Sequence, residues 1–330
     1  MLLHAIDLHK RVLQVASMRA DGEEVLQEAR IPASREALSA YLAQWPGSRH
    51  RVVVETTGSW YWVADELRER GAELKLAHAT KLEAITSAKV KTDGVDTRSM
   101  LTVMRINMVP EAHVISPELR EPRDLLRLRL RLVEKRTSTM NSIARLLEKY
   151  NRATVGALPE LAQVQAGIHQ EQIAMLNAQI RGLEKRIARE LKMNETVARL
   201  RRIPGIGRVN AWTLYLEIDG IERFATDRNF FSYCRVVPGS DNSGGRTKNK
   251  RSRAGNRYLK LALSHAAVRA VQRYAEIGAA YRKKLRKKNQ PLALAWVRKE
   301  LARIVYYVMR DGIDYDNTFR GVALSRPKKA

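Results

Sequence analysis

The sequence predicts an α/β domain at the N-terminus joined to a mostly helical C-terminal region. Two observations support this: residues 1–110 alternate between β-rich runs and amphipathic helical segments, and helical periodicity dominates after residue 110. The chain has 330 residues, of which 45% are hydrophobic, so it can bury more than one core and is not natively disordered. The predicted divisions are 1–110, a helical linker over 111–199, and 200–330.

The first elements are predicted strands. LLHAID (2–7) and RVLQVASM (11–18) are β-rich runs separated by three residues, which indicates a hairpin. After the turn RADG, the run EEVLQEARI predicts a third strand. We therefore expect three antiparallel strands to open the domain.

Helices and strands alternate over the rest of this domain. Residues 34–45 have helical spacing behind Ser34, a favourable N-cap, and end at Pro46-Gly47. The elements that follow are a buried strand at 51–56, a helix at 58–71, a strand at 72–78 and mostly helix over 79–107. The order β-β-β-α-β-α-β-α is that of an RNase H-like domain.

Four acidic residues stand at the ends of these elements. Asp7 ends the first strand, Glu55 ends the fourth, and Asp93 and Asp96 share one face where the last helix begins. Two metal ions about 4 Å apart can hold the attacking and leaving oxygens of a phosphodiester, and such ions need several carboxylate oxygens. Each acid alone is better explained as a turn cap, a strand-end acceptor or a helix N-cap. All four together favour a metal site.

The predicted linker contains two helices. Residues 123–150 have helical spacing after a predicted break between Pro117 and Pro122. A second helix carries a short heptad seam made by Ile173, Leu176, Ile180, Leu183 and Ile187. This seam is explained equally well by two helices of one chain that fold back on each other and by a coiled coil between two copies of the chain.

A short turn, IPGIG at residues 203–207, follows the linker and predicts a helix-hairpin-helix-like element. A hairpin of this type directs backbone N–H groups and a helix N-terminus at a phosphate. A plain tight turn between helices is the alternative. Neighbouring arginines favour contact with a nucleic-acid backbone, through Arg201, Arg202, Gly205, Gly207 and Arg208.

The stretch VVPGSDNSGGRTKNKRSRAGNRYLKLAL, which starts at residue 236, is the most unusual in the chain. A polar, glycine-rich part from Ser240 to Gly245 is followed by a basic arm and then by a helix rich in Leu and Ala. We expect a mobile basic loop that contacts nucleic acid through Arg246, Lys248, Lys250, Arg251, Arg253 and Arg257. Ser243 before two glycines is by itself a weak signal for a nucleophile.

The positive charge is concentrated in the C-terminal part. Lys and Arg total 60 against 35 Asp and Glu, a formal net charge of +25, which suits a nucleic-acid partner. Residues 1–110 have a net charge of +1, whereas residues 246–330 have a net charge of +18. This distribution predicts that the first part performs chemistry with acids and the last part holds phosphates.

Several other classes are disfavoured. The lone Cys234 cannot form an intramolecular disulfide, and no apolar run approaches the roughly 18 residues of a membrane span. The N-terminus has no signal-peptide layout, so we expect a cytoplasmic protein without a membrane. The seven histidines show no metal-ligand spacing with one another or with Cys234, which argues against a zinc enzyme. No Walker-type motif implies ATP.

The order of these motifs resembles the Piv-like DEDD transposases. These are the bridge-RNA-guided recombinases of bacterial insertion sequences, the IS-one-ten group. The matching residues are Asp7, Glu55, Asp93 and Asp96 within KTDGVDTR, then IPGIG, then Pro238 ahead of Ser243-Gly244-Gly245, and RAGN at 253–256. The resemblance covers nearly the whole chain, from a RuvC-like domain through a coiled-coil linker to a C-terminal transposase domain.

The resemblance implies a Mg²⁺-dependent strand-exchange reaction. Asp7, Glu55, Asp93 and Asp96 would hold Mg²⁺, and Ser243 would attack a DNA phosphate to form a transient phosphoserine link. Ser240 stays an alternative nucleophile. The implied partners are target and donor DNA and a structured non-coding guide RNA that carries the base specificity. The implied assembly is a homo-oligomer, a dimer of dimers in which the acids and the serine meet between subunits.

Two other function classes stay open. A RuvC-like Holliday-junction nuclease would use the four acids with metal-activated water and would need no serine. A non-catalytic nucleic-acid-binding protein would need only the basic half. Formation of a covalent adduct with DNA separates the three.

Overall fold

The computed structural model describes residues 1–86, 93–191, 193–243, 246–250 and 255–315, and for residues 93, 239–243 and 246–250 it describes the backbone alone. The chain divides into two compact units, Met1–Val114 and Ile115–Ala330. The second unit therefore includes both the linker and the C-terminal domain that the sequence predicted as separate parts.

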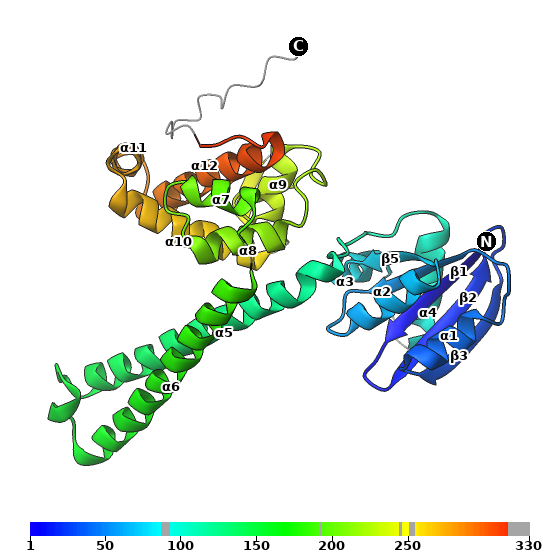
Figure 1. Cartoon of the computed structure of the whole chain (residues 1–330), viewed down its shortest axis with the longest axis horizontal. Helices are drawn as coiled ribbons and strands as arrows, with labels where there is room; N and C mark the ends of the chain where they lie inside the picture. The colour runs from blue at the N-terminus through cyan, green and yellow to red at the C-terminus, as the bar shows by residue number, and fades with distance from the viewer. Residues whose placement is uncertain (87–92, 192, 244–245, 251–254, 316–330) are drawn as a thin grey trace, which may run out of the picture. The chain divides into compact units, whose positions relative to one another are not determined.

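The first unit contains, within its described residues, a five-stranded sheet of order β3-β2-β1-β4-β5 (Figure 1). The strands β1, β2 and β3 are antiparallel neighbours, which confirms the predicted opening of the domain, and β4 and β5 run parallel to β1. The bounds are β1 (Leu2–Leu8), β2 (Val12–Arg19), β3 (Val25–Pro32), β4 (His50–Glu55) and β5 (Glu73–Ala77).

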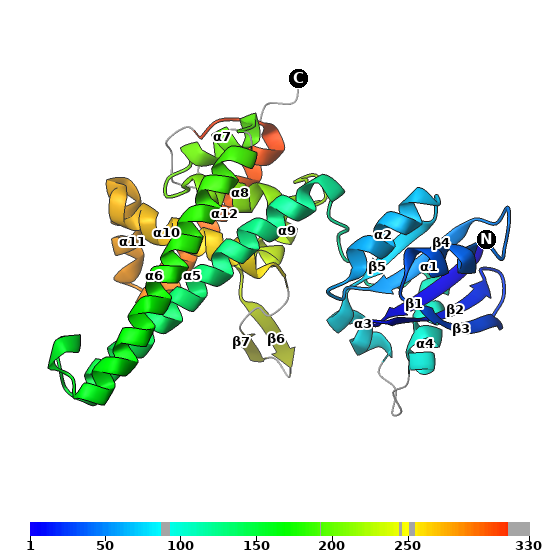
Figure 2. The ribbon, with the colours of Figure 1, turned by 60° about the horizontal axis from the view of Figure 1, so that its bottom comes forward.

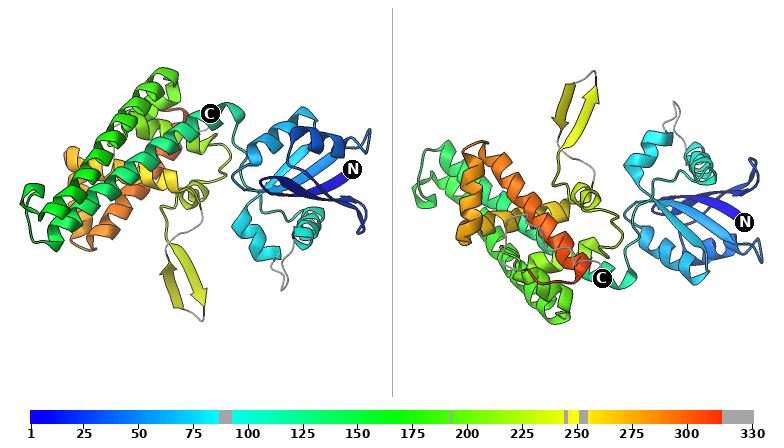
Figure 3. Two further views of the ribbon diagram at one scale, coloured as in Figure 1. Left: turned by 90° about the horizontal axis from the view of Figure 1, so that it is seen from below. Right: turned by 90° about the horizontal axis from the view of Figure 1, so that it is seen from above.

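Helices cover both faces of this sheet (Figure 3). The first pair, α1 (Arg35–Leu42) and α2 (Trp60–Glu69), packs on the face that carries Ile6 and Val54. The second pair, α3 (Ala79–Thr86) and α4 (Asp93–Arg105), packs on the face that carries Ala5 and Val53. Ser34 caps α1 as predicted, because its hydroxyl accepts a hydrogen bond from the Ala37 amide.

The second unit begins with a helical hairpin formed by α5 (Pro117–Lys149) and α6 (Glu160–Glu190), which lie side by side in Figures 1 and 2. A short 3₁₀ turn, η1 (Val155–Ala157), lies between them. Within the predicted seam, Leu176, Ile180 and Ile187 are buried. The seam therefore lies in the core of one chain, as in the folded-back alternative.

The predicted break between Pro117 and Pro122 is wrong, since α5 begins at Pro117 and continues through Pro122. Pro117 is favourable at the first helical position, where its missing N–H has no partner to lose. Pro122 lies early in the helix and removes one backbone hydrogen bond, which the long apolar contact with α6 outweighs.

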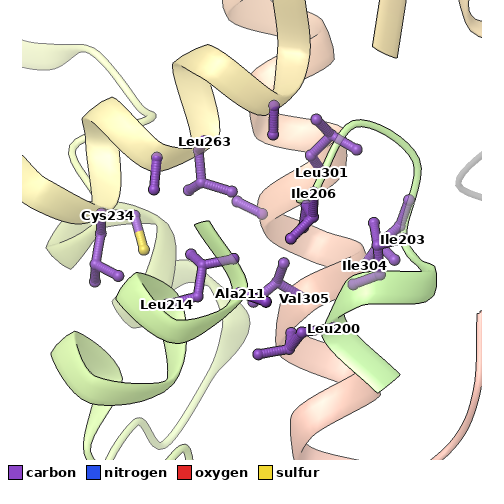
Figure 4. Close-up of a cluster of buried hydrophobic side chains, with 14 of the residues drawn as sticks. Leu200, Ile203, Ile206, Ala211, Leu214, Cys234, Leu263, Leu301, Ile304 and Val305 are labelled. Atoms are coloured by element: carbon purple, nitrogen blue, oxygen red, sulfur yellow. The ribbon is translucent and has the colours of Figure 1, made fainter. Parts of the chain in front are cut away.

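The remaining helices of the second unit surround a shared apolar core, in which Leu200, Leu263 and Val305 come from different helices (Figure 4). Ile203 and Ile206 of the IPGIG turn also belong to this core. In the described ranges, no helix of the chain is long and apolar enough to cross a membrane. The bounds are α7 (Glu195–Arg202), α8 (Arg208–Ile218), α9 (Asp227–Tyr233), α10 (Arg257–Arg273), α11 (Ala275–Leu285) and α12 (Gln290–Asp311).

A two-stranded ribbon extends from this helical unit between α9 and α10 (Figures 2 and 3). Its strands are β6 (Gly239–Ser243) and β7 (Arg246–Lys250), and Ser243 pairs with Arg246. The sequence predicted a mobile basic loop here, and the described part of the stretch is instead an antiparallel ladder. Pairing satisfies backbone N–H and C=O groups that a loop would leave to water.

Candidate active site

Asp7 and Glu55 lie level with each other on neighbouring parallel strands. The register of β1 with β4 is constant and ends with the pair Ile6 and Val54, so both acids occupy the next position. Side chains alternate between the two faces of a sheet. Both acids therefore belong to the face of Ala5 and Val53, which α4 covers.

Two ion pairs with residues in and before β3 fix the direction of α4. Arg98, in its second turn, binds Glu28 within β3, and Arg105 at its end lies 3.0 Å from Glu23, which precedes β3. Because β3 and β1 are both antiparallel to β2, they run in the same direction, and α4 runs opposite to them. The first turn of α4 therefore lies at the edge of the sheet where β1 and β4 end.

The remaining two acids are at the start of α4. Asp93 is its first residue, and the Asp93 side chain lies outside the described part of the structure. Asp96 is half-buried and precedes Met100, a residue buried against the sheet, by about one helical turn. The backbone thus brings the start of α4 to the same edge and face as Asp7 and Glu55.

Two residues at this edge carry the type of donor that a hard divalent cation prefers. Asp7 and Glu55 offer carboxylate oxygens, the donors that Mg²⁺ prefers. Next to the ends of β4 and β5, the buried Thr57 Oγ1 and His78 Nδ1 have no hydrogen-bond partner within the described residues, so the edge has unmet polar groups. Among the described side chains, which exclude Asp93, no group of three or more His, Cys, Asp and Glu residues lies close enough together to hold a metal.

Asp7 is 18% exposed, and its Oδ2 lies 3.2 Å from His9 Nε2. The carboxylate is therefore held at the strand end but still reaches solvent. This partial exposure leaves part of the carboxylate accessible to a ligand.

The candidate nucleophiles lie in the second unit. Ser243 is the last residue of β6, and Ser240 lies in the same strand, opposite Asn249. Their side chains, and those of Arg246, Lys248 and Lys250 in β7, lie outside the described part, as do Arg251 and Arg253 altogether. Arg257 begins α10, and its guanidinium lies 2.7 Å from Glu134 of α5.

The IPGIG turn divides into a buried and an exposed part. Gly205 is buried against α10, whereas Gly207, Arg201 and Arg208 are exposed. Gly207 precedes α8 and makes no side-chain cap, so the first N–H groups of that helix are open to a ligand. Arg202 is paired with Asp314.

A buried charged cluster that was not predicted from the sequence includes Asn256, the residue just before α10. Glu217 of α8 is 2% exposed and accepts hydrogen bonds from Arg123 (3.1 Å), Arg127 (2.6 and 2.8 Å) and Asn256 (2.7 Å). Burial acts to raise the pKa of the Glu217 carboxyl, but the bond from Arg127 and the charge of Arg123 outweigh it and lower the pKa. The available signal was an acid inside the otherwise apolar helix AWTLYLEI.

Comparison with known proteins gives the same family over both units. Residues 5–152 match the DEDD_Tnp_IS110 transposase family, and residues 197–283 match the Transposase IS116/IS110/IS902 family. A Pseudomonas aeruginosa protein named "Probable family 20 transposase" is 27% identical over 293 residues, covering 81% of this chain and 83% of the relative.

Two further relatives carry names of the same kind. The "Transposase for insertion sequence element IS1328" of Yersinia enterocolitica is 23% identical, covering 74% of this chain and 76% of the relative. The "Transposase for insertion sequence element IS1111A" of Coxiella burnetii is 28% identical, covering 48% of each chain. The resemblance seen in the sequence is thereby confirmed, and the chain belongs to the IS116/IS110/IS902 family of insertion-sequence transposases, which are DNA-transposing enzymes.

Proposed function

We propose that this transposase exchanges DNA strands in a Mg²⁺-dependent reaction with a serine-linked intermediate, guided by a structured non-coding RNA. The observation that carries the proposal is the edge of the sheet at which Asp7, Glu55 and the start of α4 meet. A metal-assisted phosphoryl transfer needs several carboxylates near one point, and the proposal is that these acids supply them.

An RNase H-like, RuvC-like fold is proposed for the first unit. Three antiparallel strands followed by two strands parallel to β1 support it, as does the alternation of helix and strand after β3. In such a domain Asp7, Glu55, Asp93 and Asp96 would hold Mg²⁺, which supplies neutralisation of charge on the phosphodiester.

Ser243 is the proposed nucleophile. Its hydroxyl oxygen would form a bond to a DNA phosphorus while the bond from that phosphorus to a deoxyribose oxygen breaks. The serine proton would pass to a neighbouring carboxylate, and the released deoxyribose oxygen would take a proton to become a hydroxyl. Attack of another strand's hydroxyl on the phosphoserine would reverse these steps and free the serine. Ser240 is the alternative at the same ribbon.

Nucleic acid would lie on the basic part of the second unit. Residues 246–330 have a net charge of +18, and the exposed Arg201, Gly207 and Arg208 add an open helix N-terminus. Contacts of this kind hold phosphates without reading bases. A surface that grips backbones fits a system in which base pairing by a guide RNA supplies the specificity.

Association of several copies is part of the proposal, because the acids and the serine belong to different units. An apolar stripe on α6 supports it: Leu161, which is 84% exposed, Val164, Ile168 and Met175 are exposed at heptad spacing. These residues are not the buried seam residues that join α6 to α5. A second copy could cover them.

The test is to trap the intermediate on the native insertion-sequence ends. Protein and labelled DNA are mixed with Mg²⁺, denatured and digested, and the modified peptide is sequenced. A phosphoserine adduct at Ser243 that forms with Mg²⁺ and not with a chelator is expected. Cleaved DNA without any adduct would favour the hydrolytic nuclease, and binding without products would favour the non-catalytic protein. Sequencing of RNA that copurifies with the transposase tests the guide.

A further inference from the structure

The segment that carries the β6–β7 ribbon is closed at its root. The chain leaves α9 at Tyr233 and returns at Gly255 and Asn256, where the Asn256 amide donates a 2.6 Å hydrogen bond to the Tyr233 carbonyl. A Cβ atom on Gly255 would lie 2.5 Å from the same carbonyl, and the φ of Gly255 is +103°. This close approach requires glycine, so the two ends of the segment are held together.

Asn256 connects this root to the interior of the unit. Its side-chain Oδ1 accepts hydrogen bonds from the amides of Tyr258 (2.8 Å) and Leu259 (3.1 Å) and so caps α10. Its Nδ2 donates a 2.7 Å bond to Glu217 Oε2. One amide side chain therefore both starts α10 and links the root to α8.

Glu217 extends the connection to α5. Both carboxylate oxygens accept bonds from Arg127, and Arg123 lies 3.1 Å from Oε2. The Arg127 guanidinium also lies 4.3 Å over the ring of Tyr258, in the first turn of α10. The cluster therefore ties together α5, α8 and the residue at which the ribbon segment ends.

Burying such charges is expensive, and an apolar replacement of similar volume is often at least as stable. A buried ion cluster is better explained by the geometry that it specifies than by the stability that it adds. Here the cluster joins α5 and α8 to Asn256, where the segment that carries the ribbon returns to the helical unit.

We propose that Asn256, Glu217 and Arg127 are positioning residues that fix the root of the β6–β7 ribbon on α5. The inference rests on the proposed function, in which the ribbon carries the nucleophile. A ribbon with a fixed root presents Ser243 at a defined place relative to the α5–α6 hairpin, whereas a loosened root would leave DNA binding intact and slow the transfer step.

The test compares two matched variants of the full-length chain. Asn256→Ser keeps an oxygen that can cap α10 and removes the donor to Glu217. Asn194→Ser is the control, because Asn194 caps α7 through a 2.8 Å bond to the Val197 amide and has no bond to the cluster. Both variants should melt within a few degrees of each other.

The direct readout is the position of the ribbon, measured by pulsed electron-spin distances between labels at Lys135→Cys in α5 and Thr247→Cys in β7. Asn256→Ser should widen the distance distribution at least twofold and lower transposition of the native element at least tenfold. Its affinity for a random-sequence duplex should change less than twofold. An unchanged distribution, or an equal loss in Asn194→Ser, would overturn the proposal.

A double variant tests whether Asn256 and Glu217 act through one link. Glu217→Gln added to Asn256→Ser should widen the distribution no further than the stronger single variant, since both changes break the same link, and independent additive widening would count against the link. The distance measurement needs no nucleophile. If Ser243→Ala retained activity, the serine assignment would fail while the ribbon measurement would still decide the role of Asn256.

Discussion

Gly205 lies directly against Ala266, because a Cβ atom on Gly205 would be 2.2 Å from the Ala266 carbonyl oxygen. Its φ of +80° also disfavours any side chain. Gly207 has a φ of −82°, and among the described residues beyond its two chain neighbours no atom lies within 4 Å of its Cβ position. The two glycines of IPGIG therefore differ: the first allows α10 to approach, and the second leaves the start of α8 open.

Gly205→Ala should be strongly destabilising, whereas Gly207→Ala should not. At Gly205 the added methyl meets a carbonyl that cannot move without shifting α10, so we expect a loss of at least about 2 kcal/mol in the free energy of unfolding. At Gly207 the change should be below about 1 kcal/mol. Denaturant unfolding of the two variants measures the difference, and equal losses would contradict the packing role of Gly205.

Asp7→Asn and Asp96→Asn should each abolish transposition and leave the melting temperature nearly unchanged. Removing one carboxylate weakens a cation held by few ligands without removing apolar packing. Asp21→Asn is the matched control, because Asp21 is an exposed acid paired with Arg19. Calorimetric titration with Mg²⁺ and a transposition assay provide the readouts. Full activity in either variant would remove the metal-site assignment.

Glu55→Gln distinguishes a ligand from a strand-end acceptor. A ligand should lose activity with the fold intact, since glutamine keeps the shape of the side chain. A structural acceptor should instead lose stability. Circular dichroism melting beside the transposition assay separates these outcomes.

The first unit could largely be predicted because its signals are local. A two-residue period gives the strands, and the hydroxyl of Ser34 caps a helix that begins one residue later. The position of Pro122 inside α5 could not be predicted, because the packing of α6 along α5 outweighs a local helix-breaking preference. The ribbon was missed for a similar reason: its polar sequence lacks the alternation that indicates a strand.

For the candidate site, the sequence predicted which acids stand at the ends of strands, and little more. That Asp7 and Glu55 share a face follows from the register of β1 with β4. The Glu217 cluster was not predictable, since Arg123 and Asn256 are 94 and 39 residues away from Glu217 in the chain and nothing in the local pattern links them. Such contacts depend on tertiary packing.

The stability of the first unit should decrease as the pH is lowered, because of His4. This side chain is fully buried and bonded to Ser17 Oγ (2.7 Å) and His50 Nδ1 (2.9 Å). Burial, with the charge of His50, lowers the pKa of His4 to about 3. Between pH 6.5 and 3 the unfolded chain binds a proton that the folded chain excludes. The stability that neutral His4 contributes is therefore complete above pH 6.5. It is lost as the pH falls below that value, by about 1.4 kcal/mol per pH unit.

Replacing His4 by a neutral side chain should therefore flatten the pH dependence. Between pH 7 and 4.5, His4→Gln should lose about 2 to 3 kcal/mol less stability than the wild type, whatever its stability at pH 7. Thermal unfolding at several pH values measures this. Parallel curves for the two proteins would show that His4 is not held neutral.

Nucleic-acid binding should depend steeply on salt and weakly on sequence. If side chains in residues 246–330 neutralise phosphates, log affinity should fall with log salt by roughly 0.7 to 0.9 per phosphate contact. Replacing Lys283, Lys287 and Lys288 by Gln should weaken binding about equally on all sequences and reduce this slope. Lys284 is kept, because its ammonium lies 4.8 Å over the Trp296 ring. A loss confined to one sequence would argue for base contacts.

Mixing two inactive variants tests whether the serine and the acids meet between subunits. A serine hydroxyl is a weak nucleophile at neutral pH and needs a nearby base or metal, and the acidic edge of the first unit is the proposed source of both. Ser243 lies 147 residues beyond Asp96 and in the other unit, which makes a meeting between subunits reasonable. Ser243→Ala and Asp96→Asn should each be inactive alone.

Their mixture should recover part of the activity, because a mixed oligomer contains some sites with an intact serine from one copy and intact acids from another. Random mixing of equal amounts should give an adduct yield well below that of the wild type but clearly above either variant alone. The measurement is adduct formation on labelled DNA, with Asp96→Asn mixed with itself as the baseline. No recovery would place the serine and the acids of one chain in the same site, and an adduct on Ser240 would move the nucleophile by three residues.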